Sequence, residues 1–177
     1  MRIIAGSRRG HTIYAPPGRD TRPTSDRVRE NTFNLIGPVD GASVLDLFAG
    51  SGALGLEALS RGAASAVFVE SDRDAVGAIE RNLDKLRLTG ATVLRRDALQ
   101  ALAADASAAR KYDLVLVDPP YDRYDDMQTT LARYLPEVLA EDGLLVFETS
   151  ARIEPQVPLE LRTSRRYGSV RVTLFEH

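Results

Sequence analysis

Short apolar runs alternate with segments of helical periodicity along most of the chain. Five runs have the composition of strands, and several are nearly continuous in apolar residues, as strands buried on both faces are: Ser43–Phe48, Ala66–Glu70, Thr92–Arg95, Asp113–Val117 and Leu144–Glu148. Two segments between them space their apolar residues for one helical face: Val76, Ile79, Leu83 and Leu86, and Met127, Leu131, Leu135 and Val138. This alternation predicts an α/β fold with a parallel, doubly wound sheet.

The two ends of the chain depart from this alternation. Residues 160–176 predict two strands around the turn Tyr167-Gly168-Ser169, a hairpin that closes the sheet with antiparallel pairing. Residues 1–23 contain three glycines and three prolines, and they predict a short hairpin and an extended arm. Asp26–Ile36 predicts a helix. Pro136 is expected to kink or restart the helix in which it lies, because it has no amide hydrogen to donate.

Charge is distributed unevenly along the chain. Residues 1–29 hold seven arginines and two aspartates, a net charge of +5, whereas the remainder carries −7. A basic segment on an acidic body is typical of proteins that bind polyanions, although solvated surface arginines would give the same count.

Composition narrows the possible chemistry. A length of 177 residues indicates one domain with at most a small appendage. There is no cysteine, and His11 and His177 are the two histidines, so disulfides, thiolate chemistry and a multi-histidine metal site are excluded. No apolar run reaches about 18 residues, and no apolar segment follows the N-terminal arginines. We therefore expect a cytoplasmic protein without a membrane span or a metal.

A glycine-containing loop gives the first signal for a ligand. The segment Val44–Gly55 runs from an apolar strand into a helix, and its Gly50, Gly52 and Gly55 have the G-x-G-x-x-G spacing. Glycines at such a turn let the backbone approach a nucleotide closely. The spacing alone is weak, but its strand–loop–helix context favours a nucleotide-type site.

Three acids near strand ends refine this interpretation. Glu70 ends the second strand, where a carboxylate can accept hydrogen bonds from ribose hydroxyls or stand before the next helix. Asp97 follows the third strand, where it can accept from an adenine amine, with the Ala98 amide donating to the ring, or cap a helix. Asp46 lies inside the first apolar strand, and a buried acid there requires a partner such as a ligand amine or the loop amides.

The catalytic signal is Asp118-Pro119-Pro120-Tyr121, directly after the fourth strand. Open α/β sheets bind ligands at this edge, and the two prolines remove amide donors and leave carbonyl acceptors. Asp118 and the Pro119 carbonyl can each accept one hydrogen of an exocyclic amine, which draws the nitrogen lone pair out of conjugation with the ring. Tyr121 can stack on the base.

These motifs resemble class I S-adenosylmethionine-dependent methyltransferases that act on base amines. The chain is most similar to the RsmD family, bacterial enzymes that methylate N2 of a guanine in small-subunit ribosomal RNA. Three segments carry that resemblance: Met1–Gly6, Arg22–Glu30 and Phe48–Ala58. The tetrapeptide alone would also fit DNA adenine methyltransferases or protein glutamine methyltransferases, and the N-terminal segments favour RNA.

The resemblance implies a Rossmann-like sheet of seven strands, with a basic N-terminal arm at 1–23 for RNA and a methyltransferase domain at 24–177. It implies that ten residues bind S-adenosylmethionine: Asp46, Phe48, Ala49, Gly50, Ser51, Gly52, Glu70, Ser71, Asp97 and Ala98. The catalytic residues would be Asp118, Pro119, Pro120 and Tyr121. The RNA contacts would be Arg2, Arg8, Arg9, Arg19, Arg22 and Thr24, and the substrate would be ribosomal RNA in an assembling or assembled small subunit.

Two other functions stay open on the sequence. A nicotinamide-dependent oxidoreductase is consistent with the glycine spacing and Glu70, but it leaves Asp118-Pro119-Pro120-Tyr121 without a role. A non-enzymatic RNA-binding module is consistent with the basic arm, but the intact acidic positions argue against it.

Overall fold

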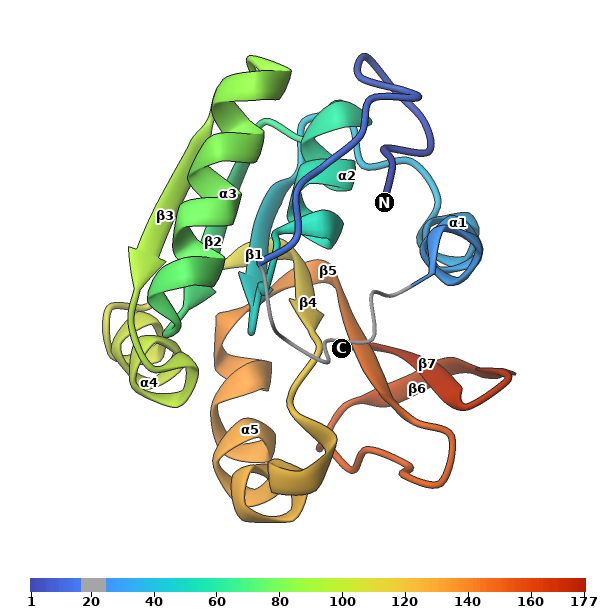
Figure 1. Cartoon of the computed structure of the whole chain (residues 1–177). Helices are drawn as coiled ribbons and strands as arrows, with labels where there is room; N and C mark the ends of the chain where they lie inside the picture. The colour runs from blue at the N-terminus through green and yellow to red at the C-terminus, as the bar shows by residue number, and fades with distance from the viewer. Residues whose placement is uncertain (17–24) are drawn as a thin grey trace.

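A seven-stranded sheet crosses the middle of the protein in a computed structural model that describes residues 1–16 and 25–177 (Figure 1). The strand order is β3-β2-β1-β4-β5-β7-β6, in which the first five strands are parallel and β7 is antiparallel to β5 and β6. The strands are β1 Ser43–Leu47, β2 Ser65–Glu70, β3 Ala91–Arg95, β4 Tyr112–Val117, β5 Leu139–Ser150, β6 Glu160–Tyr167 and β7 Val170–Glu176. The doubly wound sheet and its C-terminal antiparallel hairpin are confirmed.

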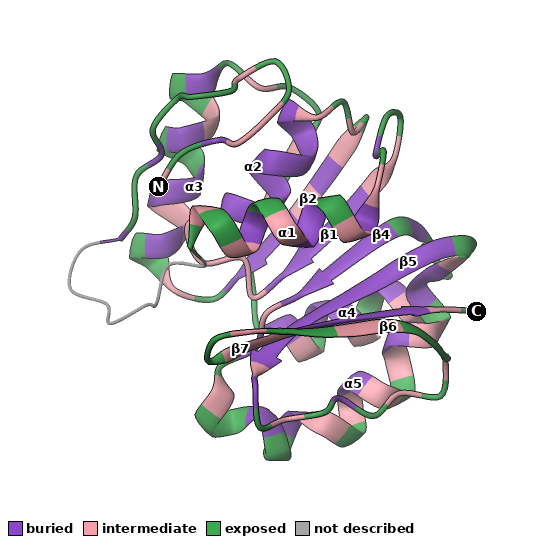
Figure 2. Ribbon diagram, turned by 90° about the vertical axis from the view of Figure 1, so that its right-hand side faces the viewer, coloured by how far each residue is buried: buried purple, intermediate pink, exposed green. Residues whose placement is uncertain are grey.

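Helices cover both faces of the sheet. They are α1 Asp26–Ile36, α2 Ala53–Ser60, α3 Arg73–Leu86, α4 Ala98–Ser107 and α5 Tyr124–Val138, with a short 3₁₀ turn η1 at Tyr121–Arg123. The apolar residues of α1, α2 and α3 form one core cluster with one face of the strands, and those of α4 and α5 form another with the opposite face. The central strands β1, β2, β4 and β5 are therefore buried on both faces over most of their length, whereas the edge strand β3 has no buried residue and the edge strand β6 is largely exposed (Figure 2).

Two elements differ from their expected form. Strand β5 begins at Leu139, five residues before the predicted run. The prediction missed this part of the strand because the exposed Glu141 and Asp142 interrupt the apolar pattern. Helix α5 does not restart at Pro136 but runs through it and ends at Val138. The proline lies in the last turn, where Leu135 and Val138 are both buried in the core, so packing holds the end of the helix.

The N-terminal arm (residues 1–16 of the described chain) packs against the domain. Its short hairpin is closed by an antiparallel bridge between Arg2 and Thr12. Ile3 and Ile13 are buried in the same core cluster as α1, α2 and α3. Figure 1 shows the arm running past α2 and α3 toward the carboxyl end of β1. The expected boundary between arm and domain, at residues 23 and 24, lies outside the described residues.

Glu57 of α2 joins the arm to the domain from a fully buried position. Its carboxylate accepts from the Ile4 and Ala5 amides at 2.9 and 3.0 Å and from Arg61 Nε at 2.9 Å. The buried Arg29 of α1 places its Nε 3.6 Å from the same carboxylate. The Glu57 carboxylate therefore contacts the arm, α1 and the end of α2.

Among the described residues, no helix is both long and apolar enough to cross a lipid bilayer.

Candidate active site

Four acidic side chains face one cavity at the carboxyl edge of the sheet: Asp46, Glu70, Asp118 and Glu148. Each lies two residues after a strand residue that packs in the α1–α3 core cluster: Val44, Phe68, Leu116 and Val146. Because strand side chains alternate between faces, all four acids are on the side of the sheet that α1, α2 and α3 cover. The cavity has a volume of about 740 Å³.

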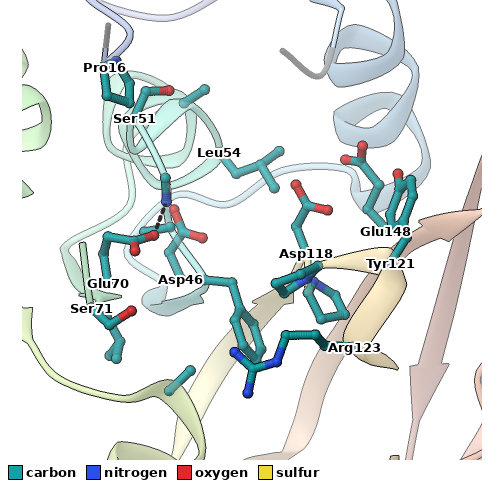
Figure 3. Close-up of a pocket in the computed structure, with 18 of the residues that line it drawn as sticks. Pro16, Asp46, Ser51, Leu54, Glu70, Ser71, Asp118, Tyr121, Arg123 and Glu148 are labelled. Atoms are coloured by element: carbon teal, nitrogen blue, oxygen red, sulfur yellow. Dashed lines mark hydrogen bonds between the residues drawn. The ribbon is translucent and has the colours of Figure 1, made fainter. Parts of the chain in front are cut away.

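The cavity lies at the point where the strand order reverses, between β1 and β4. The chain leaves β1 toward one side of this point and leaves β4 toward the other side. The two connections therefore diverge and leave a crevice at the carboxyl ends of these strands. Figure 3 shows Glu70 and Ser51 on one side of the cavity, and Asp118, Glu148 and Tyr121 on the other. The predicted catalytic residues and all of the predicted cofactor residues except Gly52 thus line one cavity.

The glycine loop after β1 contains residues with a positive φ angle. Phe48 has a φ of 59° and Gly50 a φ of 57°, both in the left-handed region. A side chain at Gly50 would meet no protein atom within 4 Å, so the loop backbone is open on that side. The Gly50 amide donates to Glu70 at 2.8 Å, which fixes the loop to the end of β2 (Figure 3).

Gly52 differs from the expected role, because it does not line the cavity. A Cβ at this position would lie 3.2 Å from Ile79 and 3.3 Å from Phe68, so Gly52 faces the core below the loop. Gly52 is the N-cap residue directly before helix α2, and its φ of 82° lies in the left-handed region that favours glycine. Gly55 is also a packing residue, since a Cβ there would meet the Phe68 ring at 2.4 Å.

Asp46 and Glu70 both accept hydrogen bonds from backbone amides. Asp46 accepts from the Gly55 amide at 3.0 Å, and Glu70 also accepts from the Asp72 amide at 2.9 Å. Burial raises the pKa of Asp46 to about 8, opposed by the Gly55 hydrogen bond and reinforced by the nearby Glu70. Asp97 caps α4 by accepting from the Gln100 amide at 3.0 Å and also lines the cavity, so both of its expected roles are compatible with its position.

The tetrapeptide Asp118-Pro119-Pro120-Tyr121 lies directly after β4, as expected. Val117 pairs with Phe147 of the neighbouring strand β5. Asp118 and Glu148 are the residues that follow this pair, so the two acids lie next to each other. Burial raises the pKa of Asp118 well above its usual value, and the negative charges of Glu148 and Asp46 raise it further. The Pro120 carbonyl accepts from the Arg123 amide at 3.2 Å, and this hydrogen bond holds the 3₁₀ turn.

Several cavity residues were not found from the sequence. Glu148 ends an apolar run just as Asp118 does, but no distinctive motif follows it. Arg123 lies at the edge of the cavity in the turn after Tyr121 (Figure 3). Ala15 and Pro16 bring the arm to the cavity, and only the folded chain places them there.

The arginines expected to contact RNA have different environments. Arg2 and Arg9 are exposed, whereas the Arg8 guanidinium donates to the backbone carbonyls of Leu86 and Arg87 at the end of α3. Arg19, Arg22 and Thr24 lie outside the described residues.

Comparison with known proteins assigns the family. The family model described as "Conserved hypothetical protein 95" matches residues 1–176. The Escherichia coli (strain K12) protein named "Ribosomal RNA small subunit methyltransferase D" is 40% identical over 164 residues, which cover 92% of this chain and 78% of that protein. The chain belongs to the RsmD family.

Solved structures agree with this assignment. The yhhF protein of Escherichia coli superposes with a TM-score of 0.83 at 36% identity, covering 100% of this chain and 97% of that one. An S-adenosylmethionine-dependent methyltransferase from Agrobacterium tumefaciens has a TM-score of 0.69 at 18% identity, covering 84% of this chain and 60% of that one, and it shares the fold. The Rossmann-like fold expected for the RsmD family is therefore confirmed.

The cavity of this RsmD-family chain fits S-adenosylmethionine. An acidic wall of Asp46 and Glu70 suits a ligand that carries a sulfonium and an ammonium group, because a buried carboxylate is stabilised by a nearby cation. The open backbone at Gly50 leaves room for the ligand beside the loop, and Glu70, Asp97 and Ala98 line the part of the cavity expected to hold the ribose and adenine.

Cofactor affinity should depend on pH through Asp46. With its pKa raised to about 8, Asp46 is largely protonated at neutral pH and must release a proton to pair with a cation. We therefore expect S-adenosylmethionine to bind more tightly as the pH rises from 6 to 8, by up to about tenfold per pH unit, with no further gain above the pKa.

Calorimetry in buffers of different ionisation enthalpy measures both the affinity and the released proton. Asp46→Asn serves as the control, because it retains any titration of the ligand and loses the titration of Asp46. In this variant the affinity should depend much less on pH. An affinity that is constant from pH 6 to 8, with no proton released, would show that Asp46 does not face the cofactor's charge.

Proposed function

We propose that the chain transfers a methyl group from S-adenosylmethionine to the exocyclic N2 amine of a guanine in small-subunit ribosomal RNA. The observation that carries the proposal is the pair of adjacent carboxylates, Asp118 and Glu148, beside a second acidic wall that suits the cofactor. The Escherichia coli relative named for ribosomal RNA methylation supports the class of substrate. The whole site lies in one cavity, so that donor and acceptor can meet.

Asp118 and the Pro119 carbonyl act on the amine. Each accepts one of its hydrogens, so the nitrogen lone pair points away from both acceptors and toward the methyl donor. Bound S-adenosylmethionine supplies a methyl group already activated by its sulfonium. The remaining task of the protein is to orient the amine and to stabilise the positive charge that develops on its nitrogen; this charge and that of the cofactor favour the ionised form of Asp118, whose pKa burial raises. The transfer leaves S-adenosylhomocysteine, and the methylated amine becomes neutral again by releasing one proton to solvent.

Glu148 favours guanine over adenine as the base. Guanine presents two adjacent donors, the N1 hydrogen and the N2 amine, whereas adenine places an acceptor nitrogen beside its N6 amine. An ionised carboxylate can only accept hydrogen bonds. With Asp118 on the amine, we expect Glu148 to accept from guanine N1 and to repel the lone pair of adenine N1.

Glu148→Gln should change which base is accepted. We expect the wild type to prefer guanine over 2-aminopurine, which retains the 2-amine but lacks the N1 hydrogen, by about 10- to 100-fold, the worth of a hydrogen bond to a charged group. The glutamine amide can donate to N1 of 2-aminopurine, so the variant should lose or reverse this preference. Reconstituted small subunits that carry either base at the modified position provide the measurement. Equal preferences in the two enzymes would remove Glu148 from base recognition.

Tyr121 lies half-buried on the wall of the cavity and is placed to stack on the base. Tyr121→Phe should stay active, because the ring alone supplies stacking, and Tyr121→Ala should lose roughly 1–3 kcal/mol of base binding. Steady-state kinetics with small subunits measure this loss. Phenylalanine as damaging as alanine would mean that the hydroxyl has a chemical role.

The substrate class is tested by offering the purified protein four acceptors: small subunits, free small-subunit ribosomal RNA, large subunits and duplex DNA. With labelled S-adenosylmethionine, we expect label to enter the small subunit or its RNA. Labelling of DNA in preference to RNA would favour the DNA adenine alternative. A comparison of the first two acceptors shows whether the enzyme acts on an assembled particle.

A further inference from the structure

The arm and α3 together form an exposed surface that carries an unusual aromatic side chain. Tyr14 is 45% exposed, and it and Leu161 are the large apolar side chains exposed among the described residues. The Arg81 guanidinium lies 5.0 Å from the centre of the Tyr14 ring, and Lys85 Nζ lies 4.8 Å from it. An exposed tyrosine between two cations has the composition of a nucleic-acid contact rather than of a core.

Further basic side chains lie near Tyr14 on α3 and on the arm. Arg81 and Lys85 are four residues apart and share one side of α3, whereas the acidic Glu80 and Asp84 occupy the neighbouring row. Arg8 contacts the end of the same helix beside the exposed Arg87, and the exposed Arg9 follows it in the arm. We call this surface, made of Arg8, Arg9, Tyr14, Arg81, Lys85 and Arg87, the arm–α3 face.

The arm–α3 face is fixed in position relative to the active site. The buried Asn82 accepts from the Tyr14 amide at 2.7 Å, and its side-chain amide donates to the Tyr14 carbonyl at 3.0 Å and to the Ser51 carbonyl at 3.1 Å. Lys85 Nζ also donates to the Thr12 carbonyl at 2.8 Å. The next two arm residues, Ala15 and Pro16, line the cavity. The face therefore leads directly to the cavity at the glycine-loop side.

We propose that the arm–α3 face docks the stretch of ribosomal RNA that flanks the target guanine. An unpaired base stacks on the Tyr14–Arg81 pair, and Arg81 and Lys85 neutralise adjacent phosphates. This inference rests on the proposed function and adds to it the direction from which the RNA reaches the cavity. A target base must leave its helix to enter the cavity, so nearby unpaired nucleotides are available to this surface.

The structure offers a matched pair of variants for the test. Arg133 of α5 is an exposed helical arginine that lies 4.9 Å from the Tyr134 ring, so Arg133→Glu makes the same change in the same kind of contact on the opposite side of the sheet. Arg81→Glu and Arg133→Glu are compared for affinity to purified small subunits over a salt series, with S-adenosylmethionine calorimetry as the folding control.

We expect Arg81→Glu to weaken subunit binding at least about tenfold and to lower the salt slope by about one unit, the effect of one lost phosphate contact. Arg133→Glu should match the wild type. Tyr14→Ala should weaken binding by about 5- to 100-fold and Tyr14→Phe should not, because a base stacks on the ring. Cofactor affinity should be unchanged in all four variants.

Three results would overturn the inference. Equal affinities and slopes for Arg81→Glu and Arg133→Glu, with the wild type active on small subunits, would remove RNA from this face and leave the proposed function intact. Loss of binding in an Arg165→Glu/Arg166→Glu variant of β6, but not in Arg81→Glu, would place the RNA on the C-terminal hairpin. A wild type that neither binds nor methylates ribosomal RNA would overturn the proposed function itself.

Discussion

Asp118→Ala is expected to lower methyl transfer to small subunits by about 10²- to 10³-fold, the typical effect of removing one preorganised group that stabilises transition-state charge. Asp118 lies next to Glu148, which we propose to be the amine side of the cavity, and we expect the cofactor at Asp46 and Glu70. Affinity for S-adenosylmethionine should therefore change little. Single-turnover kinetics and calorimetry separate the two quantities.

The matched control is Asp125→Ala. Asp125 is an exposed acid in the first turn of α5 that does not line the cavity, and it should give wild-type rates. Near-normal turnover by Asp118→Ala would contradict the assignment of the amine site. A parallel loss of cofactor affinity would instead place Asp118 on the cofactor side.

The second large effect is expected on stability, at Glu57. Glu57→Ala removes the acceptor of two arm amides and leaves the buried Arg29 without its carboxylate partner in α2. We expect a loss of about 3–5 kcal/mol in the free energy of unfolding, as for other buried ion pairs that lose one partner. Asp26 still contacts Arg29 at 2.9 Å, which favours the lower end of that range.

Denaturant unfolding of Glu57→Ala and of the double variant Arg29→Met/Glu57→Leu provides the measurement. The double variant should recover much of the loss, because it leaves no buried charge unpaired. Glu137→Ala, at an exposed position of α5, controls for the loss of a glutamate. A cost below about 1 kcal/mol for Glu57→Ala would mean that the arm is not fastened to the domain through this residue.

The arm also limits how the RNA hypothesis can be tested. Deleting it would expose the core around the sites of Ile3 and Ile13 and leave Glu57 without its amide donors. A truncated protein that failed to bind RNA would then report misfolding as much as a lost contact. Single charge reversals on the surface, such as Arg81→Glu, avoid this ambiguity.

Sequence periodicity predicted the sheet because its central strands are buried on both faces and its helices on one. It failed where polar residues occur inside an element, as Glu141 and Asp142 do in β5. It also placed Pro136 at a break, since local propensity does not include the packing of Leu135 and Val138. Local signals thus locate the elements but not all of their ends.

The site could be predicted where a motif ties a residue type to one place on the sheet. Glu70 and Asp118 follow apolar strands and precede recognisable loops, so their shared edge followed from the topology. Glu57 lies in a helix, where an acid usually indicates the solvent face, and its burial depends on Arg29 and the arm. Gly52 was assigned to the ligand from spacing alone, which cannot tell which side of the loop a missing side chain would occupy.

The most direct test of the central claim is the chemical identity of the product. Small subunits lacking the modification are incubated with the purified protein and S-adenosylmethionine, and their RNA is digested to nucleosides and analysed by mass spectrometry against standards. We expect a single new nucleoside, N2-methylguanosine, that is formed by the wild type and absent with Asp118→Ala. N6-methyladenosine, a methylated ribose or no new nucleoside would contradict the assignment of the Asp118 and Glu148 pair to a guanine amine.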